Sequence, residues 1–235
     1  MKTLVFGDTH LTNRFDSELF DYIAKLVKSA DQVIINGDFW DAYLTTFDKF
    51  CNSEWCNLFP LLKEKKTVYV FGNHDKQEYM DDRYLLFSDI QLLEHTFTSG
   101  NKKFKVQHGH LIAPAYDARF LFRNNVLVRP FYQFCVRMIE KNEFIRDMQH
   151  KSEFDLGIHK INFYIQNISK NFEKDQHYIF GHTHIHKQIP EYNIINIGVL
   201  QNKRRHYLLI EDGNIQLVPK KQQHESKKLA KNTRK

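Results

Sequence analysis

The sequence has little cysteine: only Cys51, Cys56 and Cys135 occur in 235 residues. An odd and sparse set of this kind argues against a disulfide framework. No apolar run approaches the roughly 18 residues that a membrane-spanning helix needs. The first residues also lack the basic, apolar and small-residue order of a signal peptide. We therefore expect a cytoplasmic protein, and a peripheral contact with the inner membrane surface is compatible with this expectation.

The chain has no excess of either charge outside its C-terminal segment. The formal net charge is +6, and residues 219–235 contain seven basic residues against one acidic residue, Glu225. The whole chain has 34 basic and 28 acidic residues, so residues 1–218 hold 34 minus 7, or 27, basic side chains and 28 minus 1, or 27, acidic ones. We expect a folded domain over 1–218 and a disordered basic tail over 219–235. Such a tail increases solubility, or it binds nucleic acid or an anionic membrane.

Short apolar segments alternate with helical patterns in the first third of the chain. Apolar spacing predicts helices at 16–29 and 47–65, the second with an interruption at Pro60, between strands at 2–6, 32–35 and 67–71. This order predicts a parallel sheet covered by helices, that is, an α/β fold. Continuous apolar runs in the strands agree with burial on both faces.

The second half of the chain is different, because a long helical pattern at 118–172 interrupts the strands. Later strands are expected at 90–98, 103–107, 178–180, 187–189 and 194–197, with a hairpin at 205–215 that turns at Asp212-Gly213.

Polar side chains follow five of the predicted strands. The five clusters are Asp8-Thr9-His10, Asp38, Asn73-His74, His108 and His182-Thr183-His184. Ligands of open α/β sheets bind beyond the carboxyl ends of the strands, so these clusters can converge on one point. Imidazole and carboxylate donors suit Mn, Fe, Zn, Ni or Co better than Ca. Two such ions sharing one carboxylate can hold a phosphoryl oxygen and activate a hydroxide that attacks phosphorus.

This ordered set resembles the calcineurin-like metallophosphoesterase superfamily, whose motifs are D-x-H, G-D, G-N-H-D/E, a His after a strand, and G-H-x-H. The resemblance covers roughly residues 1–200. It implies a four-layer α/β-β/α sandwich with a helical cap insertion at about 115–175. It also implies two divalent ions, with Mn²⁺ expected first. The implied ligands are Asp8, His10, Asp38 and His184 for one ion, and Asp38, Asn73, His108 and His182 for the other, so that Asp38 is the bridge.

The same resemblance implies that His74 is an unligated general acid and that Asp75 orients it. Either His108 or His110 could serve the fourth motif. We prefer His108, because family members commonly place Gly directly after the ligand, as Gly109 stands here. His110 would then support a ligand or contact the substrate. Asp41 is either another supporting group or a solvated loop carboxylate.

About 70 residues separate His110 from His182, and the stretch 119–139 within them has no acidic residue. Arginines alternate there with aromatic residues. One interpretation is an amphipathic helical hairpin with a solvated basic edge. The other is a cap over the metal site, in which Arg119 and Arg123 bind phosphate beside an aromatic wall.

Within the superfamily, the layout looks most like the UDP-2,3-diacylglucosamine pyrophosphatase group, whose helical cap takes up acyl chains. That group usually has Arg where His74 stands and Asp where His110 stands, and it lacks the Lys-rich tail. The sequence thus predicts a metal-dependent hydrolase of a phosphodiester or pyrophosphate bond, with a nucleotide-linked lipid as the candidate substrate. The alternatives are a nuclease or cyclic-nucleotide phosphodiesterase, and a non-catalytic protein-binding scaffold that retains the metal site.

Overall fold

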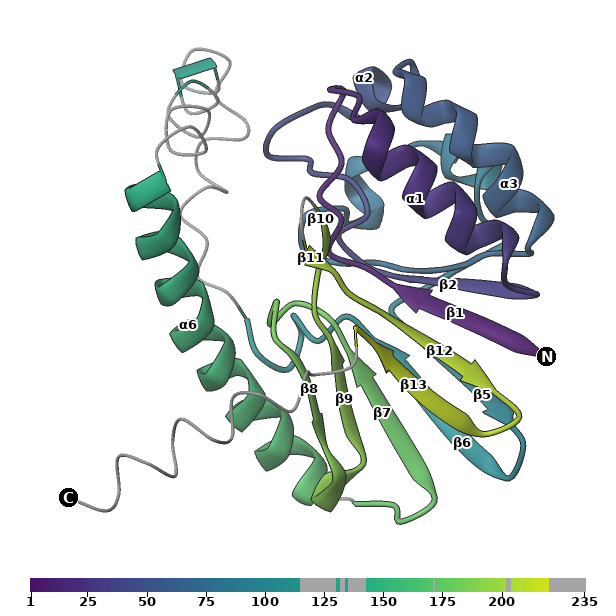
Figure 1. Cartoon of the computed structure of the whole chain (residues 1–235), viewed down its shortest axis with the longest axis vertical. Coiled ribbons are helices and arrows are strands. Elements are labelled where there is room, and N and C mark those ends of the chain that lie inside the picture. Colours follow the sequence, from purple (N-terminus) through teal and green to yellow (C-terminus); the bar gives the residue numbers. More distant parts are fainter. Residues whose placement is uncertain (115–129, 132–133, 135–142, 171, 202–203, 220–235) are drawn as a thin grey trace.

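The computed structural model describes residues 1–114, 130–131, 134, 143–170, 172–201 and 204–219. Two main sheets and helices on their outer faces make up the described body (Figure 1). The helices are α1 (Ser17–Lys28), α2 (Phe47–Cys51), α3 (Phe59–Glu64) and α6 (Glu143–Ser169), with short 3-10 turns of which η1 (Glu54–Leu58) and η3 (Asp82–Leu86) are the longest. The strands are β1 (Lys2–Phe6), β2 (Gln32–Asn36), β3 (Val68–Val70), β4 (Ile90–Leu92), β5 (Glu94–Ser99), β6 (Lys102–Gln107), β7 (Gln176–Phe180), β8 (His186–Ile189), β9 (Ile194–Ile197), β10 (Leu200–Gln201), β11 (Arg204–Arg205), β12 (Tyr207–Glu211) and β13 (Asn214–Val218).

The first sheet has the order β13-β12-β1-β2-β3-β4, and the second has the order β5-β6-β7-β9-β8. Strands β1 to β4 are parallel, as the sequence predicts, while β12 adds to β1 in the antiparallel direction. In the second sheet, β6, β7 and β9 are parallel to one another. The carboxyl ends of the parallel strands therefore meet at one edge of each sheet, which is where the polar clusters lie.

Three hydrophobic cores separate four layers. Leu4 and Phe6 of β1 pack under the helices α1 to α3, whereas Val5 between them packs in the core between the two sheets. The third core joins α6 to the second sheet, where the rings of Tyr164 and Phe180 stack with centroids 4.1 Å apart. Strands buried on both faces explain the continuous apolar runs in the sequence. The predicted four-layer α/β-β/α sandwich is thus confirmed.

Helix α1 shows how local sequence sets an element. The side chain of Asp16 accepts a hydrogen bond from the Leu19 backbone N–H at 3.0 Å, which caps the first turn. Leu19, Ile23 and Val27 then follow at helical spacing and are all buried against the first sheet.

Two predicted elements are divided in the structure. The helix expected over 47–65 is three short pieces, and the first break falls at Asn52 and Ser53 rather than at Pro60. Pro60 stands in the first turn of α3, where a missing N–H costs no hydrogen bond. The strand expected over 90–98 is also two strands, because β4 pairs with β3 in the first sheet and β5 pairs with β6 in the second.

The described part of the expected cap consists of α6 together with residues 130–131, 134, 170 and 172–175. The C-terminal half of α6 buries Ile161, Tyr164 and Ile168 against the second sheet, so this part of the insert is the fourth layer of the sandwich. The rest of the expected cap, with Arg119 and Arg123, and tail residues 220–235 lie outside the described residues. No helix in the described ranges combines the length and apolar character needed to cross a membrane.

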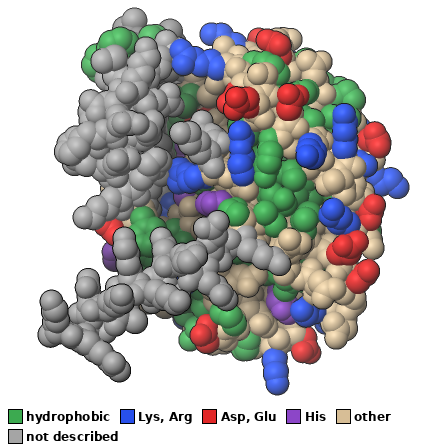
Figure 2. Space-filling view, viewed as in Figure 1, with side chains coloured by type: hydrophobic (Ala, Val, Ile, Leu, Met, Phe, Trp, Pro, Cys, Tyr) green, Lys and Arg blue, Asp and Glu red, His purple; other side chains and the backbone are tan. Residues whose placement is uncertain are grey.

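Charged side chains of both signs are mixed on the face of the body seen in Figure 2, with apolar side chains among them. This agrees with the even balance of charge that the sequence gives for residues 1–218.

Candidate metal centre

The loops after β1, β2 and β7 bring five donor residues together in an unusual backbone conformation. These residues have positive φ angles: Asp8 (50°), His10 (47°), Asp38 (52°), His182 (61°) and His184 (56°). The left-handed region is uncommon for residues other than glycine and costs of order 1–3 kcal/mol each. Backbone hydrogen bonds between the loops hold this geometry, such as Asp8 N–H to Gly37 O at 3.0 Å. The chain therefore holds these donors in strained positions that aim their side chains at one point.

Three of the predicted ligands form a first cluster, Asp8, His10 and His184, whose donor atoms lie within 4.8 Å of one another. His184 Nε2 lies 3.3 Å from His10 Nε2 and 3.3 Å from Asp8 Oδ1. Such close nitrogen and carboxylate donors match the ligand set of a small divalent ion.

A second cluster contains Asp38, His108 and His182. His108 Nε2 lies 3.2 Å from Asp38 Oδ2 and 3.2 Å from Asn73 Oδ1. All four side chains predicted for the second ion are therefore present at this cluster.

Asp38 lies between the two clusters. Its Oδ2 atom is 3.2 Å from His108 Nε2 in the second cluster and 3.9 Å from His10 Nε2 in the first. Its Oδ1 atom accepts a hydrogen bond from the His74 backbone N–H at 2.8 Å. The position of Oδ2 is the one that a bridging carboxylate needs.

Backbone carbonyls fix the direction of two imidazoles. His108 Nδ1 donates to Asn36 O at 2.9 Å, and His182 Nε2 donates to Ala113 O at 2.9 Å, since a carbonyl can only accept. The opposite nitrogens, His108 Nε2 and His182 Nδ1, are thereby left with a lone pair for a cation in the neutral ring. From α6, Lys160 Nζ donates to the His182 carbonyl at 2.8 Å and ties the insert to this loop.

Electrostatics favour a cation at the second cluster. Burial alone would lower the pKa of His108, but the Asp38 carboxylate and the more distant Asp8 raise it to about 9. Burial would raise the pKa of Asp38, yet the neighbouring His108 and His74 hold it well below its ordinary value. Burial, with the nearby His108, lowers the pKa of His182 well below its ordinary value. Without a metal, a proton on His108 therefore supplies the positive charge that Asp38 attracts.

Glycines leave room for these side chains. A Cβ atom on Gly72 would collide with Asp38 Oδ1, and one on Gly37 would come within 2.5 Å of His108 Nδ1. Gly37 also has a φ of +74°, which only glycine adopts without strain.

The His74 imidazole is buried next to the first cluster. His74 Nδ1 lies 3.1 Å from Asp41 Oδ1, while Asp41 Oδ2 lies 3.6 Å from His10 Nδ1. Burial would raise the pKa of Asp41, but His74 and His10 lower it far below its ordinary value, so this carboxylate is ionised. Asp41 is buried, which excludes the solvated loop carboxylate considered from the sequence.

The side chain of Asp75 bonds to groups other than the His74 imidazole. Its oxygens accept hydrogen bonds from Phe39 N at 2.6 Å, from Gly72 N at 2.7 Å and from the Tyr69 hydroxyl. Asp75 therefore braces the loops after β2 and β3, and the carboxylate beside His74 is that of Asp41. The resemblance to the family motif G-N-H-D/E favoured Asp75, and the signal for Asp41 was its place three residues after Asp38.

His110 lies beside the second cluster and outside it. Its ring centroid is 5.5 Å from that of His108 and 6.4 Å from that of His182. Burial and the nearby His108 lower the pKa of His110 to about 4. Of the two histidines considered for the fourth motif, His108 is the one in the cluster.

The chain is similar to one protein family and to several solved structures. The family model for the calcineurin-like phosphoesterase matches residues 1–186. No curated protein sequence matches the chain.

Among solved structures, the phosphoesterase YfcE from E. coli aligns at 15% identity with a TM-score of 0.47, covering 93% of this chain and 97% of that one. An archaeal phosphodiesterase aligns at 13% identity and a TM-score of 0.47, over 93% and 99% of the two chains. Wild-type Vps29 from Entamoeba histolytica, in complex with zinc, aligns at 15% identity and a TM-score of 0.43, over 92% and 97%. Because the family model spans all five polar strand ends, the chain belongs to the calcineurin-like phosphoesterase family.

Proposed function

We propose that this protein hydrolyses a phosphodiester or pyrophosphate bond with the help of two divalent metal ions. The observation that carries the proposal is the position of Asp38 Oδ2, because this atom lies between two clusters of donor residues. A single ion would need one of these clusters and no shared carboxylate. Two ions bound there would polarise a phosphoryl oxygen and lower the pKa of an attacking water.

The donor set fits first-row metals, with Mn²⁺ the first candidate and Fe, Zn, Ni or Co as others. Asp8, His10 and His184 would hold one ion, and the cluster of His108 and His182 with Asn73 would hold the second, with Asp38 shared. The hydrogen bonds from His108 and His182 to backbone carbonyls would keep both rings oriented before any metal arrives.

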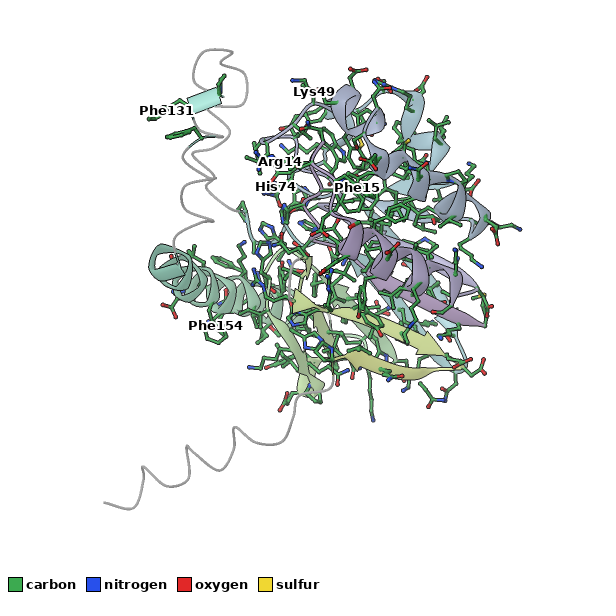
Figure 3. The ribbon with its side chains drawn as sticks, turned by 45° about the horizontal axis from the view of Figure 1, so that its top comes forward. Arg14, Phe15, Lys49, His74, Phe131 and Phe154 are labelled. Carbon is green, nitrogen blue, oxygen red and sulfur yellow. The ribbon has the colours of Figure 1, made fainter. Side chains whose placement is uncertain are left out.

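His74 is our candidate for the proton donor to the leaving group. With Nδ1 next to the ionised Asp41, its Nε2 is the nitrogen available to a substrate. The Asp41 carboxylate lies 3.1 Å from Nδ1 and is placed to orient the ring, and proton transfer from such a ring would assist departure of the leaving group. The residue lies at the edge of the body on the side that faces the insert (Figure 3).

For the substrate we propose a nucleotide-linked lipid of the kind cleaved by UDP-2,3-diacylglucosamine pyrophosphatases. The support is the exposed aromatic side chains of the insert, such as Phe131, which is 67% exposed, and Phe154, which is 56% exposed and lies apart from it (Figure 3). An apolar patch formed by such side chains would bind acyl chains.

The second candidate is a nuclease or cyclic-nucleotide phosphodiesterase, which His74 favours. An alkoxide leaving group of high pKa needs a proton more than a nucleotide phosphate does. The basic tail would then bind nucleic acid, and raising the salt concentration would weaken that binding.

The test is to remove metals with a chelator, restore Mn²⁺, and measure hydrolysis of bis-p-nitrophenyl phosphate beside p-nitrophenyl phosphate. We expect metal-dependent turnover with a preference for the diester, and a loss of at least a thousandfold in Asp38→Asn. His159→Asn is the matched control, since His159 is exposed on α6. If the protein binds metal but cleaves neither these esters nor a UDP-linked lipid, the proposal is wrong and the protein-binding scaffold is favoured.

A further inference from the structure

The ring of His74 is in contact with two other rings. Its centroid lies 4.5 Å from that of His10 at an interplanar angle of 83°, and 4.4 Å from that of Tyr43 at 81°. Tyr43 is only 4% exposed, so its ring has little freedom of its own. Perpendicular rings at this separation are favourable and are geometrically selective.

Tyr43 contacts two groups that lie next to His74, the Asp41 carboxylate and the Asn73 carbonyl. Its backbone N–H donates to Asp41 Oδ1 at 2.8 Å, the same oxygen that lies 3.1 Å from His74 Nδ1. Its hydroxyl points to the carbonyl of Asn73 at 3.5 Å, the longest of these contacts. In addition, the N–H of Ala42 donates to the carbonyl of His74 at 3.1 Å. The segment 41–43 thus holds the loop that carries His74 through both backbone and side-chain contacts.

One contact to Nδ1 cannot by itself fix an imidazole. With Asp41 alone, the ring could still rotate about its bond to Cβ and tilt about the shared contact. The rings of Tyr43 and His10 both pack edge-on against the imidazole and restrict that tilt. A proton donor that is held in one orientation avoids an entropic cost in the transition state.

We infer that Tyr43 is a positioning residue, which acts by holding the His74 imidazole with Nε2 directed toward the leaving group. The kinetic part of this inference rests on the proposed function, whereas the orientation of the ring does not. The aromatic ring of Tyr43 carries the effect. The contact between its hydroxyl and the Asn73 carbonyl adds little, because that contact is long. A purely structural Tyr43 would affect all substrates alike.

The kinetic experiment compares Tyr43→Ala and Tyr43→Phe in a series of aryl phosphodiesters of rising leaving-group pKa. We expect Tyr43→Ala to lose 10- to 100-fold in kcat with the poorest leaving group and less than threefold with p-nitrophenolate, as part of the 10²- to 10⁴-fold that general acids supply. Tyr43→Phe should restore most of the loss. In a His74→Ala background, Tyr43→Ala should cause no further loss. Tyr22→Ala, which removes a half-buried tyrosine from α1, is the matched control.

The second experiment needs no turnover. The ring signals of His74 are recorded by NMR in metal-free protein labelled on histidine, and His74→Ala identifies them. We expect one sharp set in the wild type and in Tyr43→Phe, and shifted or exchange-broadened signals in Tyr43→Ala. If Tyr43→Ala does not fold, Tyr43→Leu is measured in its place.

The two experiments separate two kinds of failure. A wild type without turnover would refute the proposed function, and the NMR spectra would still decide whether Tyr43 orients His74. Unchanged His74 signals in Tyr43→Ala, or an equal loss with good and poor leaving groups, would overturn the positioning role.

Discussion

Removing the metals should make the stability of this protein fall as the pH rises above neutrality, because of His108. Its pKa is about 9 in the folded protein against an ordinary value of 6.5, through its buried contact with Asp38. Below pH 6.5 both the folded and the unfolded chain hold this proton, so the stabilisation is fully present. Between pH 6.5 and 9 only the folded chain holds it, and the stabilisation is lost as the pH approaches 9.

The size of the effect follows from the shift of about 2.5 units, which corresponds to about 3 kcal/mol. For a chain of this length, 1 kcal/mol moves Tm by roughly 2–4 °C, so Tm should fall by roughly 6–12 °C. His10 acts in the same direction, because Asp41 and Asp38 raise its pKa in spite of its burial. His182 acts in the acid range, since its lowered pKa removes stability only as the pH falls below about 6.5.

The assay is thermal unfolding of chelator-treated protein, followed by circular dichroism from pH 6 to 9.5, for the wild type and for His108→Gln. Burial raises the pKa of Cys51 to about 12, which lowers stability above pH 9 in both proteins. The difference between the two curves therefore isolates His108. Equal slopes in the wild type and His108→Gln between pH 6.5 and 9 would refute the assignment of this proton to His108.

Four substitutions test the rest of the site. Asp38→Asn should retain the far-ultraviolet circular dichroism of the wild type and bind fewer than two metal ions by elemental analysis; full occupancy would contradict its bridging position. Gly72→Ala should force Asp38 to move and lower the metal content, and normal content would mean that the loop relaxes freely. Asp41→Asn should slow hydrolysis of esters with poor leaving groups more than that of activated esters. Asp75→Asn should instead lower Tm and slow both alike, so a selective effect would restore its expected role.

The sequence predicts the strand ends well because buried parallel strands are continuous apolar runs that stop at polar residues. For β1 the bounds agree fully with the expectation, and the hairpin turns at Asp212 and Gly213, both with positive φ, as expected. It does not predict the change of sheet after Leu92, because no glycine or proline separates β4 from β5 and the two strands look like one extended segment. Which sheet each half joins depends on partners that are distant in the chain.

The donor residues can also be recognised in the sequence, whereas the residues that contact and orient them cannot. Asp75 follows His74 directly, but the turn after β3 directs its carboxylate back to Gly72 N. Asp41 lies on another loop and reaches His74 only because β2 and β3 are adjacent in the sheet. Contacts between loops depend on the backbone path of both, and this path is set by tertiary packing.

The positive φ angles imply that the donor loops reduce stability in favour of function. His184 has a φ of 56°, and its side chain is the most exposed of the first cluster, at 25%. Asn adopts the left-handed region more readily than His. His184→Asn should therefore raise the Tm of metal-free protein by roughly 2–4 °C for each kcal/mol of relieved strain, while it weakens metal binding. The exposed helical His159 has no such strain, and His159→Asn should leave Tm nearly unchanged. A lower Tm in metal-free His184→Asn would mean that the histidine stabilises the fold, and that the strained geometry is maintained by its own contacts rather than by the surrounding backbone hydrogen bonds.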